Sequence, residues 1–73
     1  MTKDRTKQQL AEAENRISQG ELQINYVRSL ISKLQRDGHE RAAEKARLLL
    51  QNLIELQKTY ETDRDALRKE PQR

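Results

Sequence analysis

A heptad pattern runs through each half of the chain, and it constrains the fold more than any other feature. In both halves residues that are apolar or small, with the one exception of Asp63, recur at alternating steps of three and four. The first series is Leu10, Ala13, Ile17, Gly20, Ile24, Val27, Ile31 and Leu34. The second is Ala42, Ala46, Leu49, Leu53, Leu56, Tyr60, Asp63 and Leu67. This spacing is typical of long helices packed along a narrow seam. The sequence therefore predicts an all-α protein, an antiparallel two-helix coiled-coil hairpin.

The two series are separated by a short polar segment that has the features of a turn. Gly38 suits the left-handed residue that ends many helices, and Asp37 followed by Glu40 suits the start of the next one. A turn this short joins helices that are antiparallel neighbours. We therefore expect a single hairpin over residues 1–73, with helices over about 3–36 and 40–69, a turn at 37–39 and a frayed tail at 70–73.

Gly20 offers a second place at which the chain could break. The segment from Ser18 to Glu21 fits a capping box, and a glycine inside a helix costs about 1 kcal/mol. A break there would give three helices. The pattern keeps its phase across the glycine, however, because Ile17 and Ile24 are a full heptad apart. We therefore expect one continuous helix, with Gly20 facing Leu56 across the seam.

The same antiparallel pairing predicts contacts at the other end of the hairpin. It places Glu14 opposite Arg64, which is an attractive pair of charges. It also places Ala13 opposite Asp63, which would pack poorly. We therefore expect solvent to enter the open end of the hairpin.

The composition limits what such a hairpin can do alone. Charged residues make up 37% of the chain, apolar residues 33%, and there is no cysteine. A thin hairpin with so few apolar side chains leaves most of them partly exposed, so we expect a homo-oligomer. The lack of cysteine excludes disulfides and thiolate chemistry. No apolar run is long enough to span a bilayer and the first residues lack the apolar core of a signal peptide, which by elimination favours a cytoplasmic protein without membrane contact.

A second set of apolar residues lies off the predicted seam in the middle of both helices. These residues are the candidate interaction site: Leu22, Tyr26, Leu30, Leu48, Leu50 and Ile54. Exposed together, they would form a patch of the size that usually marks an interface. A four-helix bundle of two hairpins would bury them. Alternatively, a wider core stripe absorbs them within one hairpin.

Charge is unevenly distributed along the chain. Residues 28–47 carry six basic and three acidic side chains, whereas residues 11–27 and 48–63 are each acidic overall. A nucleic-acid interface usually shows a continuous basic stripe with aromatic residues for stacking. Here Asp37, Glu40 and Glu44 interrupt the basic residues, and neither tyrosine lies among them. The sequence therefore predicts a non-catalytic protein–protein interaction or adaptor module with an unknown protein partner. The alternative is a small nucleic-acid-associated protein that uses the basic turn end.

No residue pattern indicates catalysis, a cofactor or a metal. His39 is the only histidine and lies beside a glycine in the predicted turn, where an exposed polar residue is ordinary. The clustered carboxylates would need a pocket that separates their pKa values, and a thin hairpin offers none. Gly-rich phosphate loops and zinc-binding helix motifs are absent from the sequence. We therefore expect that the chain is not an enzyme.

The turn region resembles a known group of small proteins. The stretch Leu34-Gln-Arg-Asp-Gly-His39, followed by an alanine-rich helix and a Leu-Leu pair, is similar to the centre of small proteobacterial helical proteins, particularly those of rhizobial relatives. The segment from Ala13 to Glu21 is similar to their first helix. The resemblance covers about half of the chain, and no activity is established for the family. It therefore implies a bacterial helical hairpin and transfers no functional residue.

Overall fold

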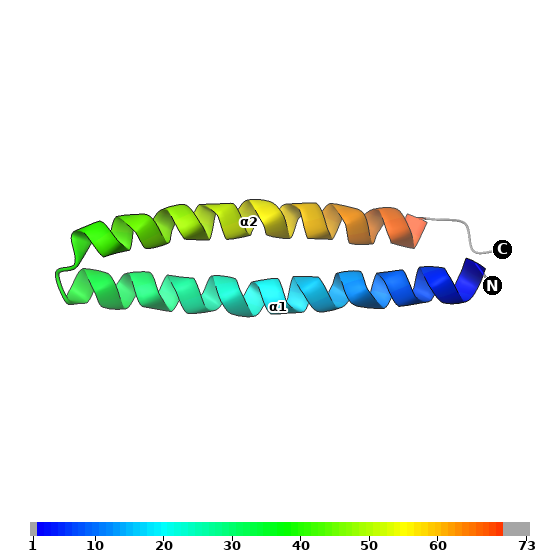
Figure 1. Ribbon diagram of the computed structural model, residues 1–73, viewed down its shortest axis with the longest axis horizontal. Coiled ribbons are helices and arrows are strands. Elements are labelled where there is room, and N and C mark those ends of the chain that lie inside the picture. The colour runs from blue at the N-terminus through cyan, green and yellow to red at the C-terminus, as the bar shows by residue number, and fades with distance from the viewer. Residues whose placement is uncertain (1, 70–73) are drawn as a thin grey trace.

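The computed structural model describes the backbone of residues 2–69 and the side chains of residues 5–69, so the predicted tail at 70–73 lies outside the described residues. Helix α1 spans Thr2–Arg36 and helix α2 spans Glu40–Lys69. The two run in opposite directions and lie side by side over the length of α2, and the start of α1 extends beyond the end of α2 (Figure 1). The result is a rod of 57 × 14 × 11 Å between Cα extremes. The predicted all-α hairpin is confirmed.

Residue composition explains why both helices are so long. The two segments are rich in Leu, Ala, Gln, Glu, Lys and Arg, which have high helix propensity, and neither contains proline. Such helices are only marginally stable alone, so packing of their apolar sides against each other stabilises them further. Helix α1 continues through Gly20 without interruption, as the unbroken heptad phase predicts.

The turn is a Schellman motif built around one glycine. Gly38 has a φ of +78°, and its N–H bonds to the carbonyl of Gln35 at 3.2 Å. The N–H of His39 reaches back to the carbonyl of Leu34 at 2.8 Å, which completes the motif. The His39 carbonyl then accepts the first bond of α2, from Ala43 at 2.9 Å. His39, and not the predicted Asp37, is therefore the N-cap of α2, because the Schellman motif already uses Asp37 to end α1.

The buried core follows the predicted seam of α1. Every member of that seam is buried or partly buried, and five of its side chains are at most 9% exposed: Ala13, Ile17, Ile24, Val27 and Ile31. Val27 and Ile31 form a cluster with Ala46 of α2, against which Leu34, Leu50 and Leu53 pack. The seam of α1 is confirmed along its whole length.

The seam of α2 was predicted wrongly at every second position. The predicted members Ala42, Leu49, Leu56 and Asp63 are exposed, whereas the residue after each of them points inward. The observed seam is Ala43, Ala46, Leu50, Leu53, Gln57, Tyr60, Arg64 and Leu67. Both series have heptad spacing and share four members, so periodicity alone does not distinguish them.

The layer of Gly20 shows why the structure uses the second series. Gln57 is only 8% exposed, and its carboxamide lies directly against Gly20, where an added Cβ would collide with it. Its Nε2 donates a hydrogen bond to the main-chain oxygen of Ile17 at 2.7 Å. Gln57, and not the predicted Leu56, therefore fills the space above the glycine.

The open end of the hairpin also differs from the prediction in its ion pairs. Glu14 pairs with Arg68 across the helices at 2.9 Å, one helical turn beyond the predicted Arg64. Arg64 lies instead in the seam with its side chain 24% exposed, and it pairs with the neighbouring Asp65 at 3.1 Å. The one-residue rotation of α2 explains both changes, since it carries Arg64 into the seam and brings Arg68 alongside α1.

Candidate interaction surface

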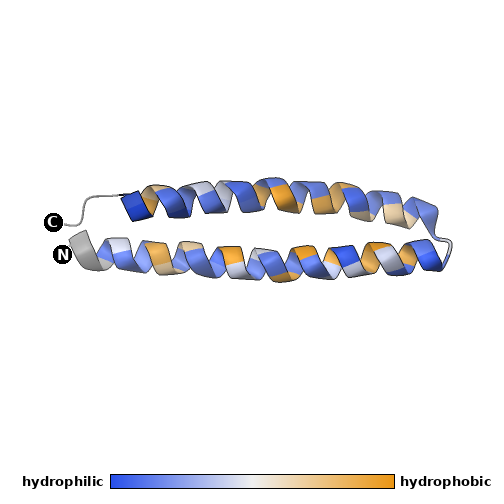
Figure 2. Ribbon diagram, turned by 180° about the vertical axis from the view of Figure 1, so that it is seen from behind, coloured by the Kyte–Doolittle hydropathy of each residue, from blue (hydrophilic) through white to orange (hydrophobic). Residues whose placement is uncertain are grey.

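An apolar groove runs along one side of the hairpin at mid-length. It is open to solvent, has a volume of about 450 Å³ and is lined by residues of both helices. Its lining is Leu22, Gln23, Tyr26 and Val27 from α1, with Leu49 and Leu53 from α2. We call the side of the hairpin that carries these residues the groove flank. Hydrophobic segments recur along α1 but gather in the middle of α2, at the level of the groove (Figure 2).

Large apolar side chains on the groove flank are unusually exposed. Leu22 is 70% exposed and Tyr26 is 69% exposed, both on α1. On α2, Leu49 is 49% and Leu56 is 45% exposed. Single exposed leucines are normal on a protein surface, but a set that lines one groove and the hollow next to it is the pattern that marks an interaction site.

The structure separates the six predicted interaction residues instead of gathering them on one face. Leu22 and Tyr26 line the groove, and Leu30 lies one turn beyond Tyr26 on the same side of α1, half-buried. Leu50 packs into the interhelical core, so its predicted place off the seam was wrong.

Leu48 and Ile54 lie elsewhere on α2. Ile54 is half-buried and two heptads before Arg68, which places it on the opposite flank, where Arg68 pairs with Glu14. Leu48 is 63% exposed and does not line the groove. Being next to Leu49 in a helix, it points about 100° away and faces outward.

Sequence reasoning missed Leu49 and Leu56 as surface residues because it had placed both in the seam. The signal that could have identified them lies in the three consecutive leucines at 48–50. Only one side chain of three consecutive helical residues can occupy a narrow seam. The other two are therefore exposed, and the neighbours in the fold decide which ones.

Two further hollows extend the groove toward the open end. The first, of about 100 Å³, lies beside the buried carboxamide of Gln57 and is walled by residues that include Arg16, Gln23, Leu53 and Leu56. The second, of about 450 Å³, has a more polar wall of Gln9, Glu12, Ala13, Arg16, Asp63, Ala66 and Leu67. The shared lining residues show that all three hollows lie on the groove flank, which is therefore apolar at mid-length and charged toward the open end.

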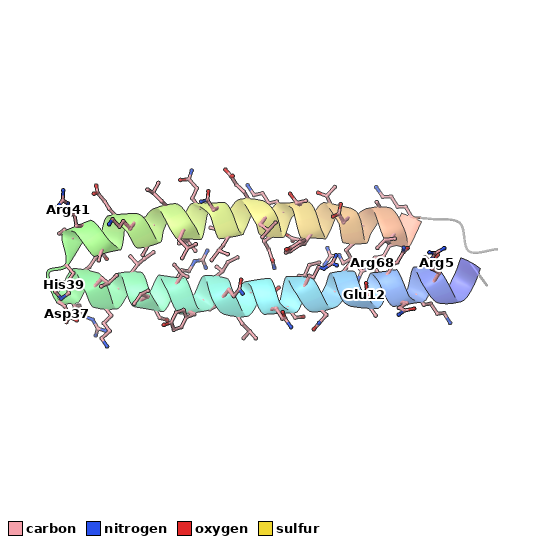
Figure 3. The ribbon with its side chains drawn as sticks, viewed as in Figure 1. Arg5, Glu12, Asp37, His39, Arg41 and Arg68 are labelled. Carbon is pink, nitrogen blue, oxygen red and sulfur yellow. The ribbon has the colours of Figure 1, made fainter. Side chains whose placement is uncertain are left out.

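The turn end carries polar side chains without a built site. His39 and Asp37 lie at the turn, and Arg41 extends away from the rod (Figure 3). His39 is exposed. Within residues 5–69, no three His, Asp or Glu side chains come close enough together to hold a metal ion.

Neither helix, over the residues described, is apolar enough for long enough to cross a lipid bilayer. No protein-family model, curated protein or solved structure matches this chain. The resemblance to small rhizobial proteins stays a prediction.

Proposed function

We propose that the protein is a non-catalytic interaction module that self-associates through the groove flank, so that two hairpins form a four-helix bundle. The observation that carries this proposal is the exposure of Leu22, Tyr26 and Leu49 along one groove and of Leu56 in the hollow that extends it. Burying these side chains against a second copy removes apolar surface from water at about 25 cal/mol per Å². The same residues in a lone hairpin would favour nonspecific association.

The shape of the surface favours a protein partner over a small ligand. The mid-length groove is wide, open and lined almost entirely by apolar side chains. Sites for small molecules usually enclose most of the ligand and place a few polar groups at defined points. An open apolar groove along a helix pair instead suits another helix, which fits its own apolar side into the groove.

An adaptor role is part of the proposal. A dimer formed through the groove flank leaves the opposite flank of each hairpin exposed, with the Glu14–Arg68 pair and the half-buried Ile54. These outer surfaces are charged, so a partner of complementary charge could be oriented on them. The module would therefore hold two equivalent outer surfaces in a fixed relationship.

A pair of neighbouring leucines provides a matched test. Leu49→Glu places a charge in the groove, whereas Leu48→Glu makes the same change one residue away on the outward side of α2. We expect the wild type and Leu48→Glu to sediment as dimers at about 100 μM, and Leu49→Glu to sediment as a helical monomer. Circular dichroism at the same concentration separates loss of association from loss of folding. A wild type that stays monomeric, or a Leu48→Glu variant as strongly affected as Leu49→Glu, would overturn the proposal.

A further inference from the structure

The groove flank carries opposite charges toward its two ends. Lys33 is one heptad beyond Tyr26, and Lys45 is one turn before Leu49, so both lie on this flank toward the turn. Glu12 and Asp63 line its hollow toward the open end together with one basic residue, Arg16. Figure 3 shows Glu12 in the open half of α1, far from the turn. All four side chains are exposed, and within the described residues none has an ion-pair partner.

Between these charges the flank carries one further charge, Arg16, which lies one turn from Glu12, and the rest of it is uncharged. The residues on the groove side between Arg16 and Lys33 are Gln19, Leu22, Gln23, Tyr26 and Leu30, and those between Lys45 and Asp63 are Leu49, Asn52, Leu56 and Thr59. This uncharged stretch is about 25 Å long at 1.5 Å per residue. Across two helices of about 10 Å diameter it presents on the order of 500 Å² per copy, which is at the lower end for a specific dimer.

Two symmetric arrangements can bring two such flanks face to face. In a parallel arrangement both turns lie at the same end, and α1 of one copy lies over α2 of the other. In an antiparallel arrangement the turns lie at opposite ends, and each helix lies over its own counterpart. A closed dimer uses one two-fold axis, so it adopts one arrangement or the other.

The positions of the four charges distinguish these arrangements. The midpoint between Glu12 and Lys33 falls at positions 22 and 23 of α1, and that between Lys45 and Asp63 falls at position 54 of α2. Gly20 contacts Gln57, so the two residues are at the same level of the hairpin. Three residues closer to the turn, position 23 of α1 is level with position 54 of α2. The two midpoints are therefore level with each other. One two-fold axis then brings Lys33 near the partner's Glu12 and, at the same time, Lys45 near the partner's Asp63.

We propose that the second copy docks antiparallel, with its turn at the opposite end, and that these two lysine–carboxylate pairs set the orientation. The parallel arrangement would instead bring four lysines together at the turn end. Arg16, which lies on the same flank, falls opposite the uncharged stretch near the partner's Leu30, where its aliphatic stem can pack. This inference rests on the proposed self-association, but it can fail while self-association holds.

A distance measurement between the two turns tests the orientation. The chain has no cysteine, so His39→Cys gives one exposed labelling site for a nitroxide in each copy. The antiparallel dimer separates the two turns by about 45 Å at 1.5 Å per residue, and a parallel dimer brings them within about 20 Å of each other. Double electron–electron resonance at a concentration where sedimentation shows dimers reads this distance. A short distance would overturn the antiparallel arrangement and keep self-association, and an absence of dimers would overturn both.

A charge exchange tests the role of the four side chains. Lys33→Glu with Lys45→Glu, or Glu12→Lys with Asp63→Lys, leaves like charges at every contact, so we expect each double variant to raise the dimer Kd by about tenfold or more at low salt. The quadruple variant restores every attraction and should bind like the wild type. Arg28→Glu with Arg47→Glu reverses the same number of charges away from the groove side and is the matched control. Double variants no weaker than this control, or a quadruple variant that stays weak, would overturn the role of these pairs.

Discussion

Gln57 donates a hydrogen bond from Nε2 to the main-chain oxygen of Ile17, across the hairpin, at 2.7 Å. This polar bond lies beside Gly20, at mid-length in a seam that is otherwise apolar there. The other end of the same carboxamide, Oε1, is buried and finds no donor among the described residues. A half-satisfied amide contributes little net stability, but a polar residue at one seam position can select a single register.

Replacing Gln57 separates these two effects. Gln57→Leu removes the buried Oε1 and keeps most of the volume, so we expect the free energy of unfolding to stay unchanged or rise by about 1 kcal/mol. Gln57→Ala opens a hollow above Gly20 and should lower it by about 1–2 kcal/mol. Urea unfolding at a fixed low concentration measures both. A leucine variant less stable than the alanine variant would contradict the assignment of Gln57 to the seam.

Gly20 and Gln57 should be strongly coupled. Alanine normally stabilises a helix interior by about 1 kcal/mol relative to glycine. At position 20 the added Cβ displaces the Gln57 carboxamide and breaks its bond to Ile17, so we expect Gly20→Ala to gain nothing or to lose stability. In a Gln57→Ala background the same change should give the full gain of about 1 kcal/mol, because the obstacle is gone. Equal effects of Gly20→Ala in the two backgrounds would show that the two residues do not interact.

Much of the fold can be predicted from the periodicity of each helix alone. The remainder depends on which residues of the two helices face each other. The seam of α1, the unbroken helix through Gly20 and the turn at Gly38 each follow from local sequence. The seam of α2 does not, because two heptad series share four positions and differ by one residue at the others. Hydrophobicity favours Leu56 over Gln57, yet the space above Gly20 and the bond to Ile17 favour Gln57. The choice between the two series therefore depends on contacts between the helices and cannot be predicted from the sequence of either helix alone.

The wrong seam of α2 also made the predicted interaction surface wrong on that helix. A seam through Leu49 leaves Leu50 outside, and a seam through Leu50 leaves Leu49 outside. The apolar residues of α1 were predicted to lie off the seam, and Leu22 and Tyr26 do line the groove. On α2 the rotation by one residue brings Leu50 into the core and leaves Leu49 beside the groove.

The two leucines should therefore respond differently to truncation. Below the concentration of self-association, Leu50→Ala removes a side chain packed on the Val27–Ile31–Ala46 cluster and should lower the free energy of unfolding by about 2–4 kcal/mol. Leu49 is half-exposed, so Leu49→Ala should cost less than about 1 kcal/mol in the same measurement. At higher concentration the ranking for self-association should reverse, with Leu49→Ala weakening the dimer. A hairpin destabilised more by Leu49→Ala than by Leu50→Ala would show that Leu49 is the seam residue, as the heptad pattern predicts.

Substitutions at Gly38 should destabilise the hairpin only through the conformation of the backbone. Its φ of +78° lies in the left-handed region, and nothing lies within 4 Å of a Cβ added there. We therefore expect Gly38→Ala to lower the free energy of unfolding by about 1–2 kcal/mol, purely through conformational strain. Gly38→Asn should cost less, because asparagine tolerates this conformation better than alanine does. Thermal unfolding of the three proteins gives the ranking, and an alanine variant as stable as the wild type would mean that the chain turns without the left-handed residue.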